Sequence, residues 1–199
     1  MYFTFIIECE VSMPLYYKSK ESFQNVPVGE ITRYITLAQP NELKVVLALT
    51  WLTGSRITEV ISLTKGNIVI DDVNRQFALN YKALKHGKQA MPSFNYNDPF
   101  VEEIIVPYVN SYKDTSFKLF TKSKRWYQQK LYDLNKRIYS DNKFNWITFH
   151  YLRHSRITFL TRTLLAQPDE LKSWTGHSST AFEVYLQPRK VDRFRGRIE

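Results

Sequence analysis

Residues 41–63 read NELKVVLALTWLTGSRITEVISL, and this stretch decides the fold. Its first half, residues 41–52, carries apolar residues at helical spacing directly after a proline, which predicts a buried helix. Gly54 follows where that helix would end, because glycine readily adopts the left-handed conformation of a helix C-cap. Ser55 is then placed to cap a second apolar helix, and Arg56 lies at the beginning of that second helix.

The pattern changes downstream of these two helices. Three short runs, residues 67–71, 76–81 and 89–94, have the composition of β-strands and are separated by turn-forming residues. They predict a small antiparallel three-stranded sheet. Helical spacing of apolar residues then returns in residues 99–109, 124–138, 151–165, 167–175 and 180–186. We therefore expect a mainly helical α+β fold with one small sheet.

The length and composition favour a single domain. The chain has 199 residues, of which 43% are hydrophobic, enough for one domain with a core and too few for two large ones. Residues 1–26 show no clean periodicity and are expected to form an N-terminal arm. We expect residues 27–187 to form the domain and the arginine-rich residues 188–199 to form a C-terminal tail.

The chain is basic, with 28 Lys and Arg residues against 19 Asp and Glu residues and a formal net charge of +9. Such an excess suits a polyanionic partner, either nucleic acid or an anionic membrane surface. The apolar run at residues 1–7 is far shorter than the roughly 20 residues that span a bilayer, and no lysine-faced amphipathic helix stands out, so we expect no membrane partner. Cys9 is the only cysteine, which excludes an internal disulfide and favours a cytoplasmic location.

Four short motifs with chemically reactive side chains follow one another along the chain. They are TGSRITE at residues 53–59, LKHGKQAMP at 84–92, HYLRHS at 150–155, and GHSS at 176–179 with Tyr185 beyond it. Each motif alone is weak, because short matches of this kind occur by chance. Their order and spacing are more specific, since 93 residues separate Arg56 from His150 and 31 separate Arg153 from Tyr185.

This combination resembles the catalytic domain of the tyrosine recombinases, the family of phage and archaeal integrases and Xer-like enzymes, over about residues 27–190. The first motif matches the family pattern T-G-x-R-x-x-E, the third matches H-x-L-R-H-S, and the fourth matches G-H-S followed by the nucleophilic tyrosine. The second is similar to the hairpin that bears the catalytic lysine, although Leu84 and His86 replace its threonines. The resemblance implies six catalytic residues, which are Arg56, Lys85, His150, Arg153, His177 and Tyr185.

The transfer of a phosphodiester explains why such residues are needed. Its transition state carries extra negative charge on the non-bridging oxygens, which two arginines can bind with planar forks of N–H donors. The resemblance assigns that clamp to Arg56 and Arg153 and the attack on phosphorus to Tyr185. It assigns the role of base to His150 and a hydrogen bond to the phosphate to His177.

The remaining steps of the implied reaction involve a lysine and a carboxylate. A lysine on a flexible hairpin can donate a proton to the departing 5′-oxygen. Lys85 matches the family's lysine best, and Lys82 is the alternative. Glu59, one helical turn from Arg56, is placed to orient a basic partner. This chemistry requires no metal ion and no organic cofactor.

The implied substrate is double-stranded DNA in a basic cleft, with Lys82, Lys88 and Arg156 as expected phosphate contacts. Because strand exchange needs at least two cleaved strands brought together, the resemblance also implies a homo-oligomer on DNA, a tetramer as in the family. Two other functions stay open. One is a type IB topoisomerase, which has the same chemistry but reseals the same strand, and the other is a non-catalytic DNA-binding regulator that retains the fold.

Overall fold

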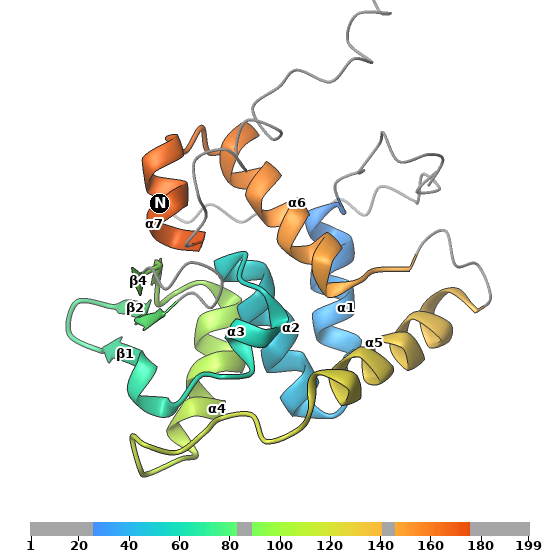
Figure 1. Cartoon of the computed structure of the whole chain (residues 1–199), viewed down its shortest axis with the longest axis horizontal. Helices are drawn as coiled ribbons and strands as arrows, with labels where there is room; N and C mark the ends of the chain where they lie inside the picture. The colour runs from blue at the N-terminus through green and yellow to red at the C-terminus, as the bar shows by residue number, and fades with distance from the viewer. Residues whose placement is uncertain (1–25, 83–88, 141–145, 176–199) are drawn as a thin grey trace, which may run out of the picture.

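The computed structural model describes residues 26–82, 89–140 and 146–175, which form a group of helices around one central helix with short strands at one side (Figure 1). The helices are α1 Val28–Leu37, α2 Asn41–Thr53, α3 Ile57–Val60, α4 Val106–Asn110, α5 Lys124–Tyr139, α6 Phe149–Arg162 and α7 Pro168–Thr175. The strands are β1 Ile68–Asp71, β2 Gln76–Leu79, β3 Tyr81–Lys82, β4 Gln89–Ala90 and β5 Ser93–Asn95. The expected mainly helical α+β fold is confirmed. Within the described ranges, no helix is both long enough and apolar enough to cross a bilayer.

Parts of the predicted organisation lie outside the described residues. They are the N-terminal arm, residues 1–26, except for Val26 itself, the helix expected at residues 180–186, and the C-terminal tail, residues 188–199. The helix α1 was not among the expected helices. It is amphipathic, and its buried side, with Ile31, Tyr34 and Ile35, packs against α2.

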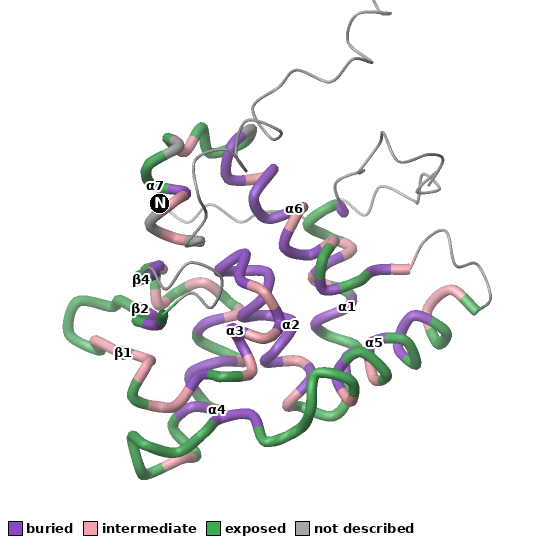
Figure 2. Tube along the Cα trace, in the orientation of Figure 1, coloured by how far each residue is buried: buried purple, intermediate pink, exposed green. Residues whose placement is uncertain are grey.

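The helix α2 is the centre of the hydrophobic core. Ten of its thirteen residues are buried, and Figure 2 shows it largely in purple. A helix that is apolar on all sides is stable only when other elements cover it. The helices α1, α3, α5 and α6 and the π-helical segment Phe100–Ile105 provide that cover. As the sequence predicts, α2 ends at Gly54, which has a left-handed φ of 63° and donates its N–H to the Thr50 carbonyl at 3.0 Å.

The second helix differs from the prediction in its length and in its cap. Helix α3 has only four residues, and its N-cap is Arg56 instead of Ser55. The Glu59 carboxylate, at the third position of the helix, accepts a hydrogen bond from the Arg56 backbone N–H at 2.7 Å, as in one half of a capping box. The helix stops early because Ser62 bonds back to the Glu59 carbonyl through both its hydroxyl and its N–H.

The predicted three-stranded sheet is confirmed, and a second strand pair accompanies it. Strands β1, β2 and β5 form an antiparallel sheet with β2 in the middle, while β3 pairs with β4. The expected strand at residues 76–81 is interrupted at Asn80, whose N–H donates to the Asn67 carbonyl at 2.7 Å. The expected strand at residues 89–94 is interrupted near Pro92, which has no N–H to donate to a ladder.

A buried amide links α1 and α5 to the segment that leads into α6. The Asn135 side-chain oxygen accepts from the Tyr34 hydroxyl at 2.6 Å and from the Ile147 N–H at 2.7 Å. Its amide nitrogen donates to the Leu131 and Ile147 carbonyls, each at 2.9 Å. Asn135 is 3% exposed, so water cannot readily replace these partners.

We predict that Asn135→Ala lowers the free energy of unfolding by about 2–4 kcal/mol, because it leaves several buried polar groups without their partners. Urea denaturation followed by circular dichroism measures the change. Asn110→Ala is the matched control, because Asn110 is exposed at the end of α4 and its substitution should change stability by less than about 0.5 kcal/mol. Equal stability of the two variants would contradict a structural role for Asn135.

Candidate active site

Arg56 and Arg153 share one buried carboxylate, Glu59. The Arg56 Nη1 atom lies 3.1 Å from Glu59 Oε1, and the Arg153 Nη1 atom lies 3.8 Å from Glu59 Oε2. The Glu59 side chain has 0% exposed surface, whereas that of Arg56 is 30% exposed. A carboxylate buried to this extent needs charged partners, and the two arginines provide them. The predicted orienting role of Glu59 is therefore matched by its contacts.

The position of Arg153 is set by α6 and by the end of α2. Helix α6 begins after Thr148, whose hydroxyl accepts the Tyr151 N–H at 3.2 Å. From the second turn of this helix the Arg153 side chain enters the interior, where it is 5% exposed. Its Nη1 atom donates to the carbonyl of Gly54. The same turn that carries Arg56 therefore also anchors Arg153.

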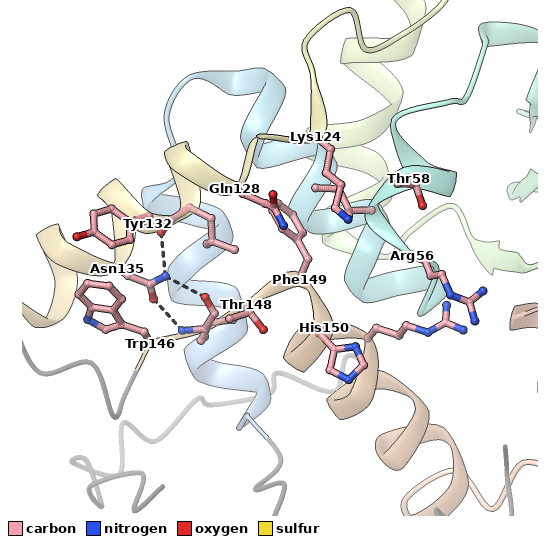
Figure 3. Close-up of a pocket in the computed structure, with 14 residues that line it drawn as sticks. Arg56, Thr58, Lys124, Gln128, Tyr132, Asn135, Trp146, Thr148, Phe149 and His150 are labelled. Atoms are coloured by element: carbon pink, nitrogen blue, oxygen red, sulfur yellow. Dashed lines mark hydrogen bonds between the residues drawn. The ribbon is translucent and has the colours of Figure 1, made fainter. Parts of the chain in front are cut away.

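An open pocket of about 510 Å³ lies beside this group. Arg56, His150 and Arg153 all line it, together with side chains from the first half of α5 such as Lys124 and Gln128. In Figure 3, Arg56 and His150 lie at one end of the pocket and Tyr132 and Trp146 lie at the other. Three side chains from two motifs that lie far apart in the sequence thus face one space.

The other expected site residues have different outcomes. Lys85, Lys88, His177 and Tyr185 lie outside the described residues. Lys82 is described and exposed, and it pairs with Gln89 across the β3–β4 ladder. The pairing places this lysine on a strand whose preceding residue, Tyr81, is buried.

The environment of Arg156 does not fit the expected phosphate contact. Arg156 is 8% exposed, and its Nε donates to the Leu52 carbonyl at 3.0 Å. Three aromatic rings surround its guanidinium carbon, those of Trp51 at 5.4 Å, Phe159 at 5.5 Å and Trp174 at 5.8 Å. Burial lowers the pKa of Arg156 to about 10, against the opposing effect of Asp98. Arg156 lies one helical turn after Arg153 on α6, and the sequence around it does not predict that its side chain is buried.

Sequence reasoning missed a buried polar pair beneath the arginines. The Tyr81 and Ser55 hydroxyls are hydrogen-bonded to each other, and the residues are only 6% and 1% exposed. Burial is the main cause that raises the pKa of Tyr81 to about 12, and the negative charge of Glu59 adds to it. The hydrogen bond to Ser55 and the positive charges of Arg153 and Arg56 lower the pKa and oppose this effect. Strand composition predicts a buried tyrosine here but cannot predict its partner.

The pocket also has lining residues that lie outside the motifs. Lys124 begins α5 and Gln128 lies one turn further along it, and both line the same space as the arginines. Among the described residues, no group of three or more His, Cys, Asp or Glu side chains has the arrangement of a metal site. The charged side chains that line this pocket, Arg56, Arg153 and Lys124, are all cationic, which suits an anionic group.

Solved structures provide a comparison for this arrangement. The XerA recombinase is similar over 94% of this chain and 68% of its own, with a TM-score of 0.66 and 17% identity. The bacteriophage HP1 integrase catalytic domain is similar over 86% of this chain and 92% of its own, with a TM-score of 0.54 and 14% identity. The chain has the fold of a tyrosine recombinase catalytic domain.

A longer recombinase shows the same fold. XerH recombinase bound to its difH substrate matches with a TM-score of 0.64 and 14% identity over 85% of this chain. The chain spans about half the length of that recombinase, 51%. No model of a known protein family matches the sequence, and no curated protein sequence matches it. The likeness to these solved recombinases is therefore one of fold.

The burial of Arg156 within this recombinase fold leads to a stability prediction. Arg156→Ala should lower the free energy of unfolding by about 2–5 kcal/mol, because it removes a packed side chain from between three rings and leaves the Leu52 carbonyl unpaired. Lys82→Ala is the control, since this exposed lysine should contribute less than about 0.5 kcal/mol. Chemical denaturation of both variants measures the difference. Wild-type stability of Arg156→Ala would contradict a structural role for Arg156.

Proposed function

We propose that this domain is a site-specific DNA recombinase that cleaves and rejoins DNA through a covalent 3′-phosphotyrosyl intermediate on Tyr185. One observation carries the proposal. Arg56, His150 and Arg153 line one open pocket, and a buried carboxylate, Glu59, holds both arginines there. These are the residues that the family motifs require to meet at a scissile phosphate.

The arginines act as a preorganised clamp for the phosphate. Each guanidinium has five N–H donors, and the bonds to Glu59 and Gly54 fix the direction in which each group points. In the proposed reaction the two groups stabilise the negative charge that increases as the nucleophile approaches phosphorus. Because Glu59 and the backbone fix the guanidinium groups before DNA arrives, little reorganisation is needed during the reaction.

The covalent step exchanges one phosphodiester for another. The Tyr185 oxygen forms a bond to phosphorus and the bond from phosphorus to the 5′-oxygen breaks, with His150 accepting the tyrosine proton. Lys85, or Lys82 as the alternative, donates a proton to the departing oxygen. His177 donates a hydrogen bond to the phosphate. Attack by a 5′-hydroxyl from another strand reverses these steps and releases Tyr185. Bond energy is conserved, so the reaction needs no nucleotide cofactor.

The DNA partner and the assembly follow from charge and from the reaction. A net charge of +9 favours phosphate contacts, for which Lys82 and Lys88 are the proposed side chains. Exchange between two duplexes requires several copies of the domain on DNA, and we propose a homotetramer in the cytoplasm. The XerH structure bound to difH substrate shows that a protein with this fold binds a DNA site.

The first test of the proposed function uses a nicked suicide DNA substrate. The wild-type chain should form a covalent DNA adduct that is visible on a denaturing gel, and Tyr185→Phe should form none, because only the hydroxyl can attack phosphorus. DNA binding by the variant should stay close to wild type, as measured by fluorescence anisotropy. An adduct at wild-type yield from Tyr185→Phe would rule out this tyrosine as the nucleophile.

The second test concerns the clamp. Arg56→Ala should slow single-turnover adduct formation at least about a hundredfold, the effect of losing one preorganised charge-stabilising donor. Arg33→Ala is a matched control, because Arg33 also pairs with a glutamate three residues away, Glu30, but is 49% exposed on α1. The control should cleave at the wild-type rate. If folded Arg56→Ala cleaves within about threefold of wild type, Arg56 is not part of the clamp.

A further inference from the structure

Three consecutive residues of the turn after α2 each have a separate anchor. The Gly54 carbonyl accepts a hydrogen bond from Arg153, and the Arg56 backbone N–H donates to Glu59 at 2.7 Å. Between them, the Ser55 hydroxyl is bonded to the Tyr81 hydroxyl. The first and third anchors belong to the arginine clamp. The second connects the turn to a different element, strand β3.

We propose that Tyr81 is a positioning residue, whose hydroxyl holds the Gly54–Arg56 turn through Ser55 and so fixes both arginines of the clamp. Neither Tyr81 nor Ser55 lines the large pocket, so the effect passes through the turn and not through contact with DNA. The inference deepens the proposed function and rests on it for the cleavage measurement described below.

The surroundings of the hydroxyl pair favour a specific anchoring role. The two side chains border a small cavity with Glu59, Thr53 and apolar residues of α2, α3 and β2, and this cavity is too small for a water molecule. Water therefore has no room to take over the hydrogen bond. The Ser55 N–H also donates a hydrogen bond, to the Thr53 hydroxyl at 3.1 Å. Both the backbone N–H and the side-chain hydroxyl of Ser55 therefore have buried partners.

Strand β3 makes Tyr81 a firm anchor. Tyr81 pairs with Ala90 of β4, and both residues are buried, while the next residue on the strand, Lys82, is exposed. The hydroxyl bond therefore also fixes the distance between the arginine turn and the strand that carries Lys82. A strand displaced relative to the turn would change the position of both groups together.

The test uses isosteric removal of each hydroxyl. Tyr81→Phe and Ser55→Ala should each slow single-turnover cleavage of the suicide substrate about tenfold at saturating DNA, the effect expected for one lost hydrogen bond. The dissociation constant for DNA should stay within about twofold of wild type. Because both substitutions break the same bond, the double variant should cleave no more slowly than either single variant.

Tyr108→Phe is the matched control. Tyr108 lies on α4, away from the clamp, and in the wild-type chain its hydroxyl donates to the Leu119 carbonyl at 2.8 Å. This variant should cleave at the wild-type rate. Wild-type cleavage by Tyr81→Phe, or multiplied effects in the double variant, would overturn the proposal.

A second measurement does not depend on catalysis. Amide hydrogen exchange of the Arg56 N–H, which donates to Glu59, should be about tenfold faster in Tyr81→Phe and unchanged in Tyr108→Phe. Unchanged exchange in Tyr81→Phe would overturn the positioning role even if the enzyme cleaves DNA. If the wild-type chain forms no adduct but the exchange rate rises as expected, the proposed function fails while the coupling between Tyr81 and the arginine turn stands.

Discussion

The buried carboxylate of Glu59 is the constraint on which the site depends. Two guanidinium groups near one another repel, and a carboxylate with no exposed surface is costly to leave without partners. Bringing the three charges together offsets both costs and fixes the arginines in one arrangement. Glu59 also accepts the Arg56 N–H and so begins α3. The same side chain therefore sets the local backbone and the electrostatics of the pocket.

Rigid elements then hold this charged group in place. Helix α2 is covered on all sides and ends in the turn that supplies the Gly54 carbonyl and Arg56. Helix α6, which supplies Arg153, packs directly on α2 and is buried although it carries several hydroxyls. The Thr158 and Thr161 hydroxyls donate to carbonyls of the preceding turn at 3.0 Å, so these two buried hydroxyls have hydrogen-bond partners. Placement on two packed helices keeps the clamp in register.

The sequence predicts those features whose causes are local. The apolar spacing of α2, the glycine at its end and the strand-like runs of the sheet depend on neighbouring residues, and the structure confirms them. Motif order also indicated that Arg56, His150 and Arg153 belong together. The break at Asn80 and the burial of Arg156 between three rings depend on partners that are distant in the sequence. No pattern within one segment carries that information.

The charges around the pocket explain why a carboxylate at its base does not repel an anion. Glu59 neutralises one of the two guanidinium charges and is shielded from the pocket by both side chains, so the surface that remains is cationic. Lys124 lines the same space, and the chain as a whole carries a charge of +9. A phosphate entering the pocket meets N–H donors, and the carboxylate behind them restricts their directions. Because directional restriction lowers the cost of reorganisation, a fixed pair of arginines with a reduced charge is better suited to a transition state than two mobile arginines with the full charge.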